Sequence, residues 1–202
     1  MHSSQIWLYA SECSRLSSNY PGRFNRTLLF KLGDRREVIA RIPFPTAGPV
    51  GLCTKSEVAT MDFLRFHFGS LIPKVLAWKA TKANEVGSEY IVMEKARGKT
   101  GQSTLPSASI VDLLRFQNQL ATIRFSSYGS IFYKEDVDPH LQQRPLYAST
   151  MVSDACSDRF RIGPSVERSF YRSERHLMKI DRGPCQYPSF GIISAVLAHF
   201  LL

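Results

Sequence analysis

Hydrophobic residues in the first hundred positions fall into short runs of strand length, separated by polar turns. Residues 27–32 and 37–42 predict two strands joined by the turn at 33–36. Residues 74–79 and 89–94 predict a second pair of strands. The sequence therefore predicts two hairpin-like units in the first half of the chain.

A helical pattern lies between these two pairs of strands. Apolar residues recur at helical spacing across 55–68, and Thr54 and Glu57 fit a capping box at its start. Gly69 and Pro73 are suited to end the helix. The order strand, strand, helix, strand, strand predicts an α+β fold with one helix on an antiparallel sheet.

The second half of the chain has a weaker pattern. A stretch rich in Gly, Ser, Thr and Pro at 96–107 indicates a boundary between lobes, and 110–125 predicts a second long helix. Residues 129–134 predict a short strand, 136–158 are expected to be mostly loop, and 169–180 predict a charged helix.

Charge and cysteine content indicate which partners and which cellular compartment suit the chain. The 26 Lys and Arg residues exceed the 17 Asp and Glu residues, giving a formal charge of +9, but they are scattered and do not interleave with aromatics as in a nucleic-acid module. The four cysteines fit neither a zinc site nor a disulfide framework, which is typical of a reduced, intracellular protein. No secretory signal is present, so a mitochondrial or cytoplasmic location is expected.

The last residues, 190–202, are almost wholly apolar. A spanning helix needs about 20 such residues, so no transmembrane segment is predicted. Three interpretations of this stretch stay open: a buried core helix, an interfacial anchor, or a tail that has lost its proper continuation.

Several polar residues near the predicted strands suit phosphate binding. A turn through Gly22, Phe24 and Asn25 precedes the first strand and is able to present amide groups to phosphate, although such a turn also serves simply to enter a strand. Arg41 lies on the second strand, where it either contacts phosphate or is an exposed strand residue. Glu57 either orients Arg41 or completes the capping box.

The end of the last predicted strand is a candidate adenine site. Backbone groups around Glu94 and Ala96 would hold the base, with Met93 as an apolar neighbour. A buried strand explains the apolar residues equally well.

Long runs of the sequence closely resemble the fungal aminoglycoside-phosphotransferase-like family, which includes the proteins named for altered inheritance of mitochondria. The resemblance covers 22–184 and is carried by Gly22-Arg23-Phe24-Asn25-Arg26 and by residues 37–45, 56–65, 73–78, 89–95, 124–130, 162–166 and 181–184. It implies a protein-kinase-like fold that uses ATP and Mg²⁺ to phosphorylate a hydroxyl of an unidentified small molecule. Arg41 would contact the phosphates and Glu57 would orient it.

The resemblance also implies a division of the chain. Residues 22–96 would form the ATP-binding lobe and 97–184 an incomplete, mostly helical second lobe, flanked by an N-terminal segment at 1–21 and the tail at 185–202. Little chain precedes the phosphate turn, so part of the first lobe is expected to be deleted there.

Some features of the family are missing. The turn has Pro21-Gly22-Arg23 where the family usually has paired glycines, and none of the five histidines begins a His-x-Asp catalytic segment. Asp181-Arg182-Gly183 resembles a metal-binding D-F-G only superficially, because no catalytic segment precedes it. No catalytic or metal-binding residue is therefore assigned.

The sequence leads to one main hypothesis and two alternatives. The main one is a truncated, inactive member of the family with a residual ATP-binding lobe. The first alternative is an active phosphotransferase whose true sequence continues past Leu202. The second is a pseudokinase-like module that binds a protein partner. Whether the chain is an enzyme stays open at this point.

Overall fold

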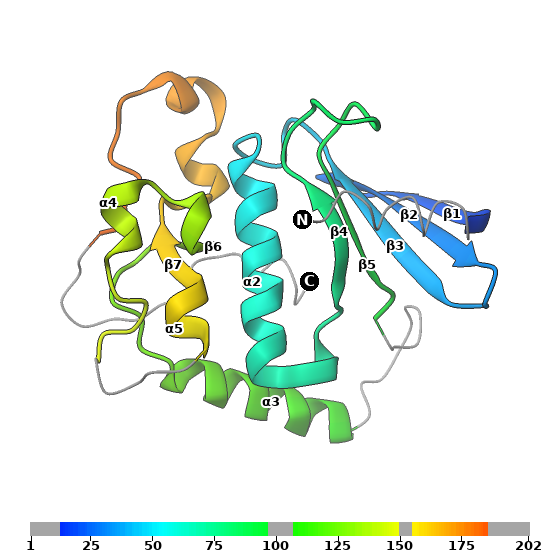
Figure 1. Cartoon of the computed structure of the whole chain (residues 1–202), viewed down its shortest axis with the longest axis horizontal. Coiled ribbons are helices and arrows are strands. Elements are labelled where there is room, and N and C mark those ends of the chain that lie inside the picture. Colours follow the sequence, from blue (N-terminus) through cyan, green and yellow to red (C-terminus); the bar gives the residue numbers. More distant parts are fainter. Residues whose placement is uncertain (1–12, 97–106, 150–154, 186–202) are drawn as a thin grey trace. The chain divides into compact units, whose positions relative to one another are not determined.

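A computed structural model describes residues 13–96, 107–149 and 155–185. The chain divides into two compact units, shown together in Figure 1. The first contains the described residues up to Ala96 and also takes in Val166–Asp181 from much later in the sequence. The second contains the described residues between Ser107 and Ser165 and those from Arg182. The predicted tail lies almost entirely outside the described residues.

The first unit is built on a five-stranded antiparallel sheet in the order β1-β2-β3-β5-β4 (Figure 1). In chain order, its strands are β1 (Cys13–Pro21), β2 (Asn25–Leu32), β3 (Glu37–Pro43), β4 (Val75–Lys79) and β5 (Tyr90–Glu94). Four of these confirm the predicted strands. The edge strand β1 was not predicted, and it supplies sheet structure where part of the lobe was expected to be deleted.

A single long helix, α2 (Leu52–Phe68), connects β3 to β4 and contacts both β4 and β5. Its residues Val58, Met61 and Phe63 are buried, as is Ile91 on the central strand β5, because apolar faces of helix and sheet gain free energy when they leave water. The helix ends at Gly69, whose amide donates back to the Arg65 carbonyl. The α+β prediction, with one helix and an antiparallel sheet, is confirmed for this unit.

The remaining part of the first unit is Val166–Asp181. Its two short 3₁₀ turns, Arg168–Phe170 and Ser173–Leu177, replace the predicted charged helix at 169–180, which is wrong. Ser173 has a positive φ of 54°, and the charged side chains of this stretch are exposed rather than arranged about a buried face. Without an apolar stripe to bury, the charged pattern does not sustain a helix.

The second unit combines one long helix and two short ones with a two-stranded sheet in its described residues. It contains α3 (Ser107–Thr122), β6 (Ser130–Tyr133), α4 (Pro139–Gln142), α5 (Ala155–Arg159) and β7 (Phe160–Gly163), with β6 and β7 antiparallel. The predicted helix and the short strand are confirmed as α3 and β6, whereas β7 was not predicted. Its core contains Phe132, Leu141, Leu146 and Phe160.

Candidate functional site

The turn through Gly22, Phe24 and Asn25, called the phosphate turn because the sequence predicts that it contacts phosphate, connects β1 to β2. The amide of Gly22 donates to the carbonyl of Asn25 at 2.8 Å, which closes the turn. A Cβ on Gly22 would lie only 2.9 Å from that carbonyl oxygen, so the turn requires glycine for lack of space. Gly22 therefore shapes the turn, and its own amide is already bonded within it.

Arg41 and Glu57 form an ion pair between β3 and α2. Arg41 Nη1 donates to Glu57 Oε1, and the two side chains are 21% and 22% exposed. Because the pair is largely withdrawn from water, its attraction is screened less than that of a surface pair. The structure thus brings together the two residues that the sequence proposed as partners.

Asn25 joins this pair from the first residue of β2. When its amide oxygen faces Arg41, Oδ1 accepts from Arg41 Nη2 at 2.8 Å and Nδ2 donates to the Phe24 carbonyl at 3.2 Å. Arg41 is therefore held on one side by a carboxylate and on the other by an amide, with the phosphate turn as their neighbour.

The start of α2 is stabilised differently from the prediction. The helix begins at Leu52, three residues before the predicted start, and the Thr54–Glu57 capping box is absent. Instead, the buried carboxylate of Glu89 accepts from the Gly51 amide at 3.0 Å and from Thr54 Oγ1 at 2.7 Å. A carboxylate at this end of a helix is favoured by the helix dipole. Since Glu57 does not serve as a cap, it is available to pair with Arg41.

A second cation reaches the phosphate turn from the late part of the same unit. The guanidinium carbon of Arg168 lies 3.8 Å from the centre of the Phe24 ring, and that of Arg23 lies 5.3 Å from it. Arg168 is separated from Phe24 by more than 140 residues, so no local sequence signal indicated this contact. Phe24 serves here as a platform for arginines.

The candidate adenine site is partly occupied by the chain's own hydrogen bonds. The amide of Glu94 donates to the Lys74 carbonyl at 2.9 Å, and the amide of Lys95 donates to the Glu37 carbonyl at 3.3 Å. Met93 is buried in the sheet. An adenine here would have to use carbonyl groups or the amide of Ala96.

The strand register gives the distance between the candidate adenine site at Glu94 and the position of Arg41. Val38 pairs with Glu94 and Arg41 pairs with Ile91 across β3 and β5. Three residues of strand separate the two positions, which is about 10 Å.

Cys53 lies one turn before Glu57 on α2. Burial of the thiol, together with the nearby charges of Glu57 and Glu89, raises the pKa of Cys53 from 9.0 to about 12. The thiol therefore stays protonated at neutral pH and is unsuited to act as a nucleophile.

Among the described ranges, no group of three or more His, Cys, Asp or Glu side chains could hold a metal ion. Within the same ranges, no helix is both long and apolar enough to cross a membrane.

Most of the chain is similar to known fungal proteins. A subtelomeric hrmA-associated cluster protein of Aspergillus fumigatus is 38% identical over 192 residues, which are 92% of this chain and 36% of that protein. Altered inheritance of mitochondria protein 9, mitochondrial, of Candida albicans is 33% identical over 179 residues, or 81% of this chain and 28% of that protein. The protein of the same name from Debaryomyces hansenii is 32% identical over 178 residues, or 80% and 28%.

These comparisons confirm part of the resemblance. The likeness to fungal proteins that include those named for altered inheritance of mitochondria is confirmed. No family model matches the chain, so its kinase-like assignment stays a prediction. The chain spans about a third of the length of the curated relatives it matches.

Proposed function

We propose that the first unit is the nucleotide-binding lobe of a kinase-like phosphotransferase, and that it binds ATP with the phosphates at Arg41. The observation that carries this proposal is the Arg41–Glu57 ion pair. Kinase-like enzymes hold ATP phosphates with a cation on the third strand, which an acid on the following helix keeps in place. The position of Arg41 on β3 and of Glu57 on the following helix α2 supports these two roles.

The strand order supports the same reading. The helix that carries the acid is inserted between β3 and β4, and β3 is flanked by β2 and β5. The phosphate turn between β1 and β2 is placed next to Arg41 through Asn25. One side of the sheet therefore gathers a turn, a cation and an orienting acid.

The chemistry of each residue follows from its contacts. Arg41 keeps a fixed charge and has a planar set of N–H donors, so it is suited to contact two phosphate oxygens. Glu57 and Asn25 restrict the guanidinium to one orientation. Backbone groups at Glu94–Ala96 would hold the adenine. Magnesium would arrive with ATP, and we assign it no protein ligand.

We further propose that this chain by itself does not transfer the phosphoryl group. In kinase-like enzymes an Asp of a His-x-Asp-type segment accepts the proton of the acceptor hydroxyl, and no such segment occurs in these 202 residues. General-base assistance of this kind contributes about 10²–10⁴-fold in rate. The relatives' names support a mitochondrial location for this chain, which we include in the proposal.

Titration of the full chain with Mg-ATP tests the proposal. Calorimetry and thermal melting should both show saturable binding, with stabilisation of about 2.7 kcal/mol at a ligand concentration of 100 times Kd. Removing the charged hydrogen bonds in Arg41→Ala should weaken binding about 10- to 100-fold. Arg41→Lys, which keeps a cation opposite Glu57, should lose less.

Lys82→Ala is the matched control, because Lys82 is an exposed cation in the turn between β4 and β5. Its affinity for ATP should equal that of the unmodified chain. Absence of saturable binding, or equal losses in Arg41→Ala and Lys82→Ala, would refute the nucleotide site. Sustained ADP formation that Arg41→Ala abolishes would refute the proposed inactivity.

A further inference from the structure

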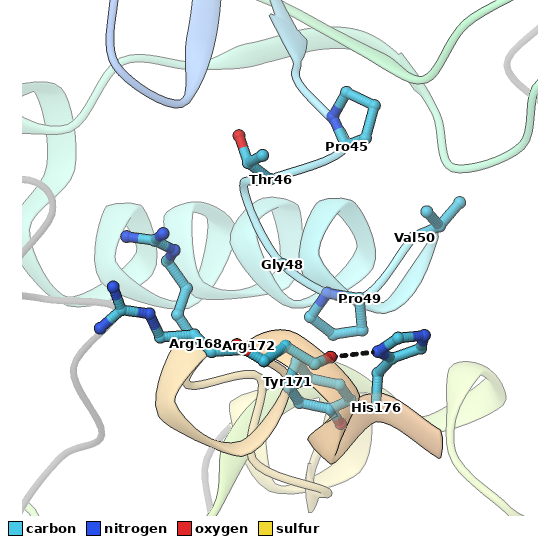
Figure 2. Close-up of a pocket in the computed structure, with 10 residues that line it drawn as sticks. Pro45, Thr46, Gly48, Pro49, Val50, Arg168, Tyr171, Arg172 and His176 are labelled. Atoms are coloured by element: carbon cyan, nitrogen blue, oxygen red, sulfur yellow. Dashed lines mark hydrogen bonds between the residues drawn. The ribbon is translucent and has the colours of Figure 1, made fainter.

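A pocket of about 580 Å³ lies within the first unit, and neither Arg41 nor Glu57 lines it. One wall is the connection between β3 and α2, including Thr46, Pro49 and Val50; the other is formed by Arg168–His176 (Figure 2). This volume falls in the range of about 300–1,000 Å³ that is usual for small-molecule sites. The pocket brings together two segments that are more than 110 residues apart in sequence.

The first wall is held closely by its own contacts. The amide of Cys53 donates to the Pro49 carbonyl at 3.1 Å, and the amide of Ala47 donates to the Phe44 carbonyl at 2.8 Å. A Cβ on Gly48 would lie 2.6 Å from Cys53 Sγ, so the chain packs onto α2 at that point without room for a side chain. The wall is thus a defined surface rather than a free loop.

The second wall carries the positive charge. Figure 2 shows the side chains of Arg168 and Arg172 extending to the same side of the pocket. In the part of the chain that the structure describes, neither guanidinium forms an ion pair with a carboxylate. Two cations on one side repel each other, and an anion bound there would remove that repulsion.

Arg168 is also fixed in place. Its guanidinium carbon lies over the Phe24 ring, 3.8 Å from the ring centre, and this cation–π contact restricts the side chain. The side chain therefore loses little freedom when it binds an anion, which lowers the entropic cost of binding.

The other side of the pocket is less polar. Pro49 and Val50 lie there together with the rings of Tyr171 and His176 (Figure 2). The Nδ1 of His176 donates to the Ser173 carbonyl at 2.6 Å, because a carbonyl only accepts, and this bond holds the imidazole ring. Flat and aliphatic groups on this side suit a flat apolar portion of a ligand.

We propose that this pocket binds a small phosphomonoester with a flat apolar body, its phosphate at Arg168 and Arg172. Two guanidiniums match the nearly double charge of a phosphomonoester at neutral pH better than the single charge of a carboxylate. The site is separate from the proposed nucleotide site and does not depend on it. Because Arg168 also contacts Phe24 of the proposed nucleotide site, Arg172 tests the pocket more cleanly.

Phenyl phosphate is the probe, titrated into the full chain by calorimetry at pH 7.5 and fixed ionic strength. We expect saturable binding that Arg172→Ala weakens about 10- to 100-fold and that Arg172→Lys weakens less. Benzoate should bind more weakly than phenyl phosphate. Lys179→Ala removes an exposed cation of the same segment that does not line the pocket, so it should bind as the unmodified chain does.

The outcomes separate this pocket from the nucleotide site. Binding of phenyl phosphate should survive Arg41→Ala, and ATP binding should survive Arg172→Ala. The pocket is refuted by lack of saturable binding, or by equal losses in Arg172→Ala and Lys179→Ala, which would show a general effect of charge. Loss of phenyl phosphate binding in Arg41→Ala but not in Arg172→Ala would place the probe at the nucleotide site and equally refute the proposal.

Discussion

Substitution of Glu89 tests how the fold positions helix α2, and with it Glu57. The Glu89 side chain is 7% exposed and comes from the residue just before β5. It accepts hydrogen bonds from the Gly51 amide and from Thr54 Oγ1, and Thr54 is 1% exposed. Glu89→Ala leaves the part-buried Gly51 amide and the buried Thr54 hydroxyl without this acceptor.

The size of the effect follows from these two contacts. Hydrogen bonds to a charged group contribute about 1.5–3 kcal/mol each, so the two together amount to roughly 3–6 kcal/mol. Removing the buried carboxylate recovers part of its desolvation penalty, which reduces the loss. We expect Glu89→Ala to lower the free energy of unfolding by about 2–4 kcal/mol, and Glu89→Gln, which keeps one acceptor oxygen, by about 1–2 kcal/mol.

Urea unfolding followed by circular dichroism measures these changes, provided that the slope with urea is unchanged. Glu85→Ala is the matched control, because Glu85 is an exposed carboxylate in the same turn, and it should stay within about 0.5 kcal/mol of the unmodified chain. A cycle of Glu89→Gln with Thr54→Val isolates the bond between them. We expect a coupling of about 1 kcal/mol or more.

Two results would refute the reasoning. If Glu89→Ala costs no more than Glu85→Ala, the carboxylate does not stabilise the start of α2. If the effects of Glu89→Gln and Thr54→Val simply add, the two side chains do not share a bond of consequence. In either case the position of Glu57 would need another explanation.

Three further predictions concern other parts of the chain. Arg161 is buried and donates to three backbone carbonyls of the second unit at 2.5–2.7 Å. Arg161→Met should therefore lower the free energy of unfolding in urea by about 2–4 kcal/mol. Arg124→Ala is the control, because Arg124 is exposed, and it should have little effect. A cost below about 0.5 kcal/mol would contradict this. The raised pKa of Cys53 predicts that iodoacetamide at pH 8 modifies the exposed Cys185 well before Cys53, as followed by mass spectrometry of peptides. Equal rates would contradict it. The same raised pKa predicts that stability present below pH 9 declines as pH rises toward 12, because the unfolded thiol ionises first.

The pairing of Arg41 with Glu57 was predictable from the sequence, whereas the Glu89 cap on α2 and the contact of Arg168 with Phe24 were not. Strand and helix periodicity placed Arg41 on β3 and Glu57 on α2, and the ion pair between them confirms their proximity. The capping box with Thr54 was the role of Glu57 that the local sequence favoured, and it is wrong. The buried carboxylate of Glu89, just before β5, accepts the hydrogen bond of Thr54 Oγ1 instead, and the four-residue motif does not reveal this distant partner.

The sequence by itself determined the elements whose signals are local. Short runs of apolar and β-branched residues, bounded by turn residues, predicted β2, β3, β4 and β5, and apolar residues at helical spacing predicted α2. These patterns were readable because each depends on only a few neighbouring residues. Only the tertiary structure decided that residues 13–21 pair with β2, that Glu89 caps α2 and that Arg168 lies on Phe24. The last two depend on contact between segments distant in sequence, whose free energy arises only once the sheet and helix have packed.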